Sequence, residues 1–326
     1  MRPAAKAFTG MHRKSEAHLS ADDRKTPPFS REMIFRYGAL ERVAPGLRRI
    51  VCHNPGPFTF KGTNLYVIGE GEVAVVDPGP EREDQLDVLL EGLGGEKITH
   101  ILVTHCHLDH SGAVAALKER TGAKTGGMPR RPRDPGKDAI GPSGRSFIVP
   151  VDFDVPLKDG SKLAGTGFEI EAIHTPGHAP DHLCYYLPVS NILLSGDHAM
   201  GWNTSVVAPP EGHMGSYMRS LERLMERGES VYFPAHGGPI RDPQRYLKAL
   251  ILHRRWRESE IVECLKNGAV TVTAMAPRIY NGLDPSLLGA AALALFAQLE
   301  FMTEKGTVVT RKPGPLAIDQ EFALAC

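Results

Sequence analysis

Three histidines and one aspartate fall within six residues, at His105, His107, Asp109 and His110. Imidazole and carboxylate groups are both good zinc ligands. His105 and His107 alternate along an extended stretch, so both side chains can point the same way while Cys106 points away. One metal ion needs three or four ligands, so this cluster can begin two metal sites but cannot complete both. The alternative is a polar turn whose histidines only form hydrogen bonds, and four ligand-type residues at this spacing disfavour it.

Two predicted elements position this cluster. Residues 97–103 are apolar and rich in β-branched side chains, which predicts a buried strand. Residues 111–120 predict a helix that ends at Gly122. The cluster therefore lies between the carboxyl end of a strand and a helix, where open α/β sheets place their chemistry.

Further ligand candidates follow three other predicted strands. His178 comes after residues 168–173, Asp197 after residues 191–194, and His236 after residues 230–233. In each case a short apolar strand is followed by Gly or Pro and a ligand-type residue. These loops can supply the ligands that the first cluster lacks.

Residues 45–245 resemble the metallo-β-lactamase superfamily, through the HxHxDH motif at residues 105–110 and the downstream His178, Asp197 and His236. Residues 54–58 and 62–64 resemble the opening of one subgroup, the β-lactamase-like protein 2 group. The resemblance implies an α/β fold, the αββα sandwich of the superfamily. It also implies a hydrolase that uses a metal-bound hydroxide.

The resemblance implies a role for each ligand candidate. His105, His107 and His178 correspond to the ligands of a first metal ion, and Asp109, His110 and His236 to those of a second. Asp197 corresponds to the bridging carboxylate. Two Zn²⁺ ions are the expected cofactors, with iron or manganese as alternatives. Asp109 is also the expected catalytic residue, because it can orient the attacking water.

Residues outside the ligand set have weaker assignments. Asp77 ends a predicted strand on the side of the metal loops, where it can support a ligand or simply form an Asp-Pro-Gly turn. Trp202, Asn203, Thr204 and Ser205 follow Asp197 and are the candidates for the substrate-pocket wall. Residues 122–145 are rich in Gly, Pro and Arg, which predicts an irregular exposed loop that either steers an anionic substrate or is merely solvated.

The chain divides into three predicted parts. Residues 1–30 are polar and predict a disordered tail, and residues 31–245 form the catalytic domain. Residues 246–326 predict helices at 246–266, 273–280 and 285–303 and a hairpin of 306–310 with 316–318, which resembles a winged helix. Residues 286–302 contain no Lys or Arg, so specific DNA binding is not expected. Packing on the catalytic domain or formation of a homodimer fits this region better.

Composition limits the cellular compartments and the classes of partner that we expect. Lys plus Arg and Asp plus Glu both number 38, so the chain has no strong charge bias. The five cysteines show no disulfide framework, the sequence has no apolar stretch long enough to span a bilayer, and the N-terminus lacks a secretory signal. We therefore expect a cytoplasmic protein with no membrane partner.

The expected reaction is hydrolysis of an ester, thioester or lactone bond in a small molecule. An endoribonuclease acting on single-stranded RNA is the alternative, supported by the basic tail and the Arg-rich loop. Residues 50–249, with nineteen basic and twenty-five acidic side chains, do not favour it. An iron-binding redox protein is a third hypothesis of another class.

Overall fold

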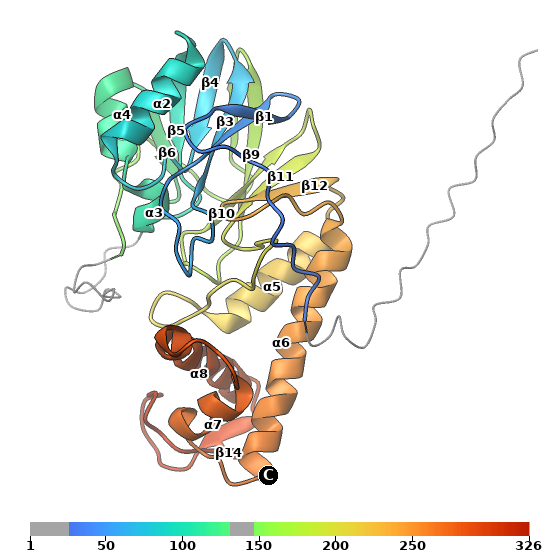
Figure 1. The fold of residues 1–326 in the computed structure, drawn as a ribbon. Coiled ribbons are helices and arrows are strands. Elements are labelled where there is room, and N and C mark those ends of the chain that lie inside the picture. The colour runs from blue at the N-terminus through green and yellow to red at the C-terminus, as the bar shows by residue number, and fades with distance from the viewer. Residues whose placement is uncertain (1–25, 131–146, 326) are drawn as a thin grey trace, which may run out of the picture.

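The computed structural model describes residues 26–130 and 147–325, which form two facing β-sheets flanked by helices and a smaller helical unit (Figure 1). The first sheet has the strand order β1-β2-β3-β4-β5-β6-β7 and the second β12-β11-β10-β9-β8. The strands of the first sheet are β1 (Glu41–Ala44), β2 (Leu47–Val51), β3 (Asn64–Glu70), β4 (Glu72–Val76), β5 (Lys97–Leu102), β6 (Lys124–Gly127) and β7 (Val155–Pro156). Those of the second are β8 (Lys162–Gly165), β9 (Phe168–His174), β10 (Leu183–Leu187), β11 (Ile192–Gly196) and β12 (Val231–Pro234).

Side chains of alternate residues divide the sheets between separate cores. On β4, Ala74 and Val76 face the second sheet, while Val73 and Val75 face the helices α2 (Glu83–Leu93) and α4 (Val114–Thr121). The outer face of the second sheet packs against α5 (Met214–Met225) and the first half of α6 (Pro243–Lys266). These four layers are the expected αββα sandwich.

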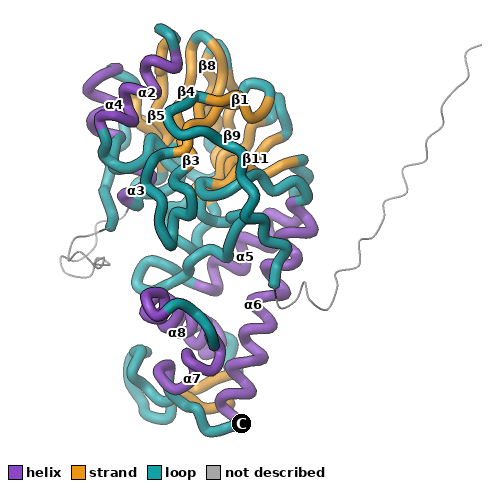
Figure 2. The backbone as a smooth tube through the Cα atoms, viewed as in Figure 1, coloured by secondary structure: helices purple, strands orange, loops and turns teal. Residues whose placement is uncertain are grey.

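The C-terminal unit shares a helix with the sandwich. Leu247 and Leu250 of α6 belong to the sandwich core, whereas Ile261 and Leu265 pack with the C-terminal helices. Figure 2 shows this helix running from one unit to the other. The remaining elements are α7 (Val272–Ile279), the 3₁₀-helix η1 (Pro285–Leu287), α8 (Leu288–Glu304), β13 (Val308–Thr310) and β14 (Phe322–Leu324). The winged-helix resemblance and the domain limits stay predictions, and α6 crosses the expected boundary at residues 245–246.

The predicted C-terminal hairpin is wrong in its second strand. β13 pairs antiparallel with β14, so residues 316–318 lie in the connection. The physical reason is burial: Phe322 is fully buried in the C-terminal core, whereas Leu316 and Ile318 are exposed.

Three other local predictions need correction. The helix predicted over residues 111–120 is two helices, α3 (Leu108–Ser111) and α4, because the chain leaves helical geometry at Ala113. Residues 124–127, expected to be irregular, form β6, whose backbone pairs in parallel with β5. Residues 26–30, expected in the tail, contact the sandwich: Phe29 packs on Tyr246 and the Ser30 amide donates to Gly201. The rest of the predicted tail and residues 131–145 of the loop lie outside the described residues.

Two further observations concern membrane-spanning helices and the pairing of cysteines. None of the helices in the described part of the chain combines the length and apolar character that crossing a bilayer requires. Cys52, Cys106, Cys184 and Cys264 are buried and unpaired.

Candidate metal centre

All seven predicted ligands come together where the strands of both sheets end. His105, His107, Asp109 and His110 lie between β5 and α4, as the sequence indicated. His178, Asp197 and His236 lie just after β9, β11 and β12, respectively. Because β11 and β12 are parallel neighbours, their carboxyl ends deliver the last two side chains to the same edge.

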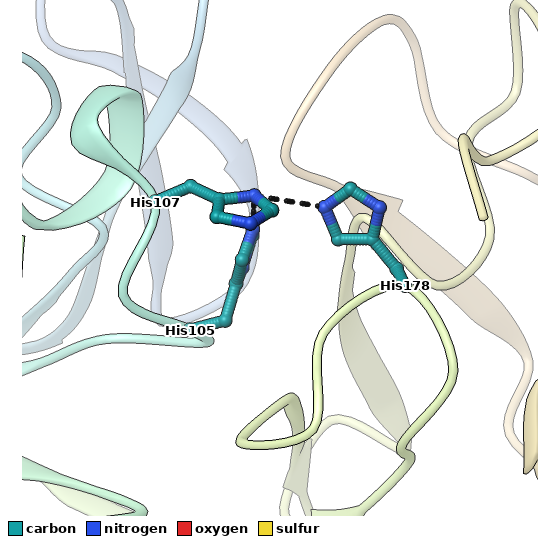
Figure 3. Close-up of side chains that lie close together, drawn as sticks. All are labelled: His105, His107 and His178. Carbon is teal, nitrogen blue, oxygen red and sulfur yellow. Dashed lines mark hydrogen bonds between the residues drawn. The ribbon is translucent and has the colours of Figure 1, made fainter. Parts of the chain in front are cut away.

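Three imidazoles converge at one side of the cluster. Nδ1 of His107 lies 2.8 Å from Nε2 of His105 and 3.0 Å from Nε2 of His178. Figure 3 shows the His178 ring meeting the other two from the opposite loop. These nitrogens are close enough to share a single cation.

A second group adjoins the first, with Asp197 between them. Nε2 of His236 lies 3.2 Å from Oδ2 of Asp109, and Nε2 of His110 lies 3.4 Å from the same oxygen. The Asp197 carboxylate lies 3.6 Å from Nε2 of His178 through Oδ2 and 3.4 Å from Nε2 of His236 through Oδ1. A carboxylate that faces both groups can bridge two ions.

The donor atoms fit metal ions. Nε2 of His110 and Oδ1 of Asp197 are buried and have no hydrogen-bond partner among the described residues. Burial, together with neighbouring imidazoles, holds the pKa values of His105 and His107 well below their ordinary range. Uncharged imidazoles next to carboxylates are the donor set that zinc takes, and unsatisfied buried polar atoms are costly without such a partner. The seven residues form three overlapping groups whose ligand atoms lie within 4.8 Å of one another.

Neighbouring groups fix the histidine rings. Nδ1 of His110 donates to Oδ2 of Asp77 at 2.9 Å, and Asp77 also accepts from the backbone amide and hydroxyl of Thr104. Nδ1 of His178 donates to the Val206 carbonyl at 2.6 Å. When the ring is uncharged, each bond leaves Nε2 with a lone pair that can face the cluster. Asp77 therefore contacts both the turn and the His110 ring, and its role as a support for a metal ligand stays a prediction.

Gly177 allows the His178 loop to lie close to α5. A Cβ atom on Gly177 would come within 2.4 Å of the Tyr217 Cα, and the φ angle of Gly177 is 151°. A larger residue here would displace the loop that carries His178.

The predicted pocket-wall residues separate into two places. Asn203, Thr204 and Ser205 line a cavity of about 320 Å³ between the sandwich and the C-terminal helices. Trp202 does not line that cavity; its buried ring stacks on Phe60, with 4.9 Å between ring centroids.

Arg130 was expected on an exposed loop, and this prediction is wrong. Its side chain is only 10% exposed and pairs with Asp181 at 3.1 Å and Glu211 at 2.5 Å. Asp181 in turn accepts from the Cys106 amide within the metal-site turn. Two buried carboxylates, distant in sequence, attract this arginine inward, so Arg130 supports the site loops and is not available to steer substrate.

Two contacts at the site were not predicted from the sequence. The Thr63 hydroxyl lies 3.4 Å from Oδ2 of Asp109, and the Val206 carbonyl holds His178. Thr63 immediately precedes β3 and pairs with His236 in an isolated bridge, so its position at a strand end was the available signal.

Comparison with known proteins agrees with this geometry. The profile of the metallo-β-lactamase superfamily matches residues 58–236. The lactamase-like protein adaB of Aspergillus niger is 31% identical over 242 residues, covering 73% of this chain and 70% of that protein. The atrochrysone carboxyl ACP thioesterase dmxR1 of a Cryptosporiopsis species is 30% identical over 240 residues, covering 73% and 68%. A β-lactamase domain protein of Burkholderia ambifaria superposes with a TM-score of 0.76 over 90% of this chain and 96% of that one, at 20% identity, and so shares the fold.

The αββα fold and a cluster of seven ligand-type side chains define a metal-dependent hydrolase. This chain belongs to the metallo-β-lactamase superfamily. The narrower resemblance to the β-lactamase-like protein 2 group stays a prediction.

Proposed function

We propose that this protein is a dinuclear-zinc hydrolase that cleaves a thioester bond in a small substrate. The observation that carries the proposal is the pair of ligand groups with Asp197 between them. His105, His107 and His178 would hold one ion, and Asp109, His110 and His236 the other. When bound, two zinc ions supply Lewis acidity and lower the pKa of water to about 7.

The chain's own residues orient the reactants. Burial would raise the pKa of the Asp109 carboxyl, but the adjacent His110 and His236 more than offset this, so the carboxylate stays ionised at neutral pH. Its Oδ2 accepts from Thr63, which fixes the carboxylate as an acceptor for a water proton. Hydrolysis then forms a C–O bond and breaks the C–S bond. The water oxygen goes to the carboxylic acid and one water proton to the thiol.

Two observations favour a thioester among the expected bonds. A relative that shares 30% identity with this chain is named as an acyl-carrier-protein thioesterase. The cavity lined by Val206, whose carbonyl accepts from His178, also has an apolar part that suits an acyl group, formed by Leu283, Leu287 and three alanines. Arg130 does not support the RNA alternative, because it is buried in an ion pair; the other basic residues of the Arg-rich loop lie outside the described residues.

The first experiment combines metal content with substrate turnover. We expect nearly two zinc ions per chain by elemental analysis. In a panel of a thioester, a lactone, a chromogenic β-lactam and single-stranded RNA, we expect the thioester to be cleaved fastest. Asp109→Ala should reduce kcat by at least about 100-fold. Asp87→Ala is the matched control, because Asp87 lies on α2 and pairs with Arg120 at 2.7 Å.

The same sample tests the other hypotheses. Bound iron with visible absorption and no hydrolysis would support the redox protein instead. Cleavage of RNA alone would support the endoribonuclease. A folded, zinc-supplied protein that binds no metal would refute the proposal.

A further inference from the structure

The cavity between the sandwich and the C-terminal helices adjoins the proposed metal site. Val206 lines the cavity, and its carbonyl accepts from His178 at 2.6 Å. Phe58 also lines the cavity and precedes Thr63 by five residues; the Thr63 hydroxyl lies 3.4 Å from Asp109. The cavity lining is therefore linked to the metal cluster by the Val206–His178 hydrogen bond and, along the chain, through the segment that ends at Thr63. A substrate with its reacting bond at the cluster can extend into this cavity.

One side of the cavity is apolar and has small side chains. The C-terminal unit contributes Leu283, Leu287 and the alanines Ala290, Ala291 and Ala294. Alanine side chains on α8 leave room that larger residues would fill. The volume of about 320 Å³ suits an apolar group the size of a medium-length acyl chain or a small ring system.

A buried cation also lines the cavity. The side chain of Arg254 is only 6% exposed and lines the cavity. One of its terminal nitrogens donates to the Ser205 carbonyl at 2.6 Å, and its guanidinium lies 5.2 Å from the centre of the Tyr217 ring. Among the described residues, the Arg254 Nε has no hydrogen-bond partner and its guanidinium forms no ion pair with a carboxylate.

Neighbouring arginines on α6 differ in this respect. Arg257 also lines the cavity, but it pairs with Glu260 at 2.7 Å. Arg255 is exposed and lies 3.5 Å from Glu222. A buried charge without a counter-ion is unfavourable. An incoming anion would therefore gain more interaction free energy at Arg254 than at the two paired arginines.

We propose that this cavity is a substrate-specificity subsite, which accepts an apolar group carrying an oxyanion and pairs that oxyanion with Arg254. The inference rests on the proposed function, since it places the substrate's reacting bond at the metal cluster. The oxyanion has two sources in a thioester substrate: a carboxylate on the acyl group, or a phosphate on the thiol arm. The apolar lining that the C-terminal unit contributes is common to both.

Binding of amide analogues separates these sources, because an amide in place of the thioester resists hydrolysis. Three ligands share an eight-carbon acyl chain: a neutral octanoyl amide of pantetheine amine, the same amide with a terminal acyl carboxylate, and the neutral amide with a phosphorylated arm. Calorimetry with the full metal-loaded chain gives their Kd values. We expect one of the two anionic ligands to bind at least about tenfold more tightly than the neutral one, as a charge-assisted hydrogen bond provides.

Variants assign the effect to the cavity. Arg254→Met should abolish the preference for the anionic ligand, Arg254→Lys should retain part of it, and the exposed control Arg255→Met should keep it in full. Ala294→Phe keeps the charge but narrows the cavity, so it should weaken all three ligands. Ala294→Phe also tests the cavity if Arg254→Met does not fold.

The outcomes distinguish this proposal from the proposed function. Equal binding of neutral and anionic ligands to the wild-type protein, or an anion preference that survives Arg254→Met, would overturn the subsite. Tight, Arg254-dependent binding in a protein that cleaves no thioester would retain the subsite and reject the thioesterase. A preference for the phosphorylated ligand would support the oxyanion subsite and assign it to the thiol arm.

Discussion

Oδ2 of Asp77 lies 2.9 Å from Nδ1 of His110, and this contact joins the end of β4 to the proposed second metal site. The carboxylate also holds Thr104 through two hydrogen bonds, so it fixes both the turn and the ring. Both side chains are buried, which strengthens their interaction.

Replacement of Asp77 with Asn should therefore weaken metal binding without removing a ligand. The amide cannot accept through both side-chain atoms, so the His110 ring loses part of its orientation. We expect metal affinity to fall by about 10- to 100-fold, as for other residues that hold a ligand histidine. Competition with a chromogenic chelator measures this, with Asp87→Asn as control. An unchanged affinity would show that the His110 ring is fixed by other contacts.

Removal of the metal should destabilise the protein as well as inactivate it. Seven ligand-type side chains are brought together around buried atoms that have no partner in the described structure. An ion at a free concentration of 100 Kd would stabilise the native state by about 2.7 kcal/mol. We expect Tm to fall after dialysis against a chelator and to recover, with activity, on addition of Zn²⁺. Full activity in the metal-depleted protein would contradict the dependence on metal.

Arg130→Met should be strongly destabilising because it removes a buried cation that pairs with the buried carboxylates of Asp181 and Glu211. Loss of one partner from a buried ion pair costs about 3–5 kcal/mol. The matched variant is Arg120→Met, since Arg120 pairs with the exposed Asp87 and should contribute no more than about 1 kcal/mol. Urea unfolding of both variants measures the difference, and comparable losses would mean that the Arg130 cluster is not a tight structural contact.

Asp154 should make stability depend on acid pH. Hydrogen bonds from Lys118, then from Thr125, lower the pKa of Asp154 to about 2, while an unfolded aspartate has a pKa of about 3.9. A lowered native pKa means that the ionised group stabilises the fold above about pH 4, and that this contribution is lost as the pH falls toward 2. The difference in free energy of unfolding between wild type and Asp154→Asn should therefore shrink between pH 6 and pH 2.5. A difference independent of pH would indicate that the charge has no role.

Local sequence patterns were sufficient to locate the seven ligand candidates and the four strands that precede them. Four of the seven ligands lie within six residues, and the other three follow strands whose apolar runs are easily recognised. Helix α2 is an example of an element with a locally defined end, because the following Gly94 adopts the left-handed conformation. Such elements depend mainly on neighbouring residues, and their ends can be read from the chain.

Other features depend on residues that are far apart in the sequence. Arg130 is buried only because folding brings Asp181 and Glu211 to it, and β14 forms at Phe322 because the C-terminal core has room for that ring. Arg254 and the alanines of α8 form one cavity because α6 continues from the sandwich into the C-terminal unit. The sequence by itself therefore determined which residues are candidate metal ligands. The tertiary structure decided which charges are buried, how they are paired and where a substrate can extend, because burial and ion pairing depend on distances between residues that local patterns do not encode.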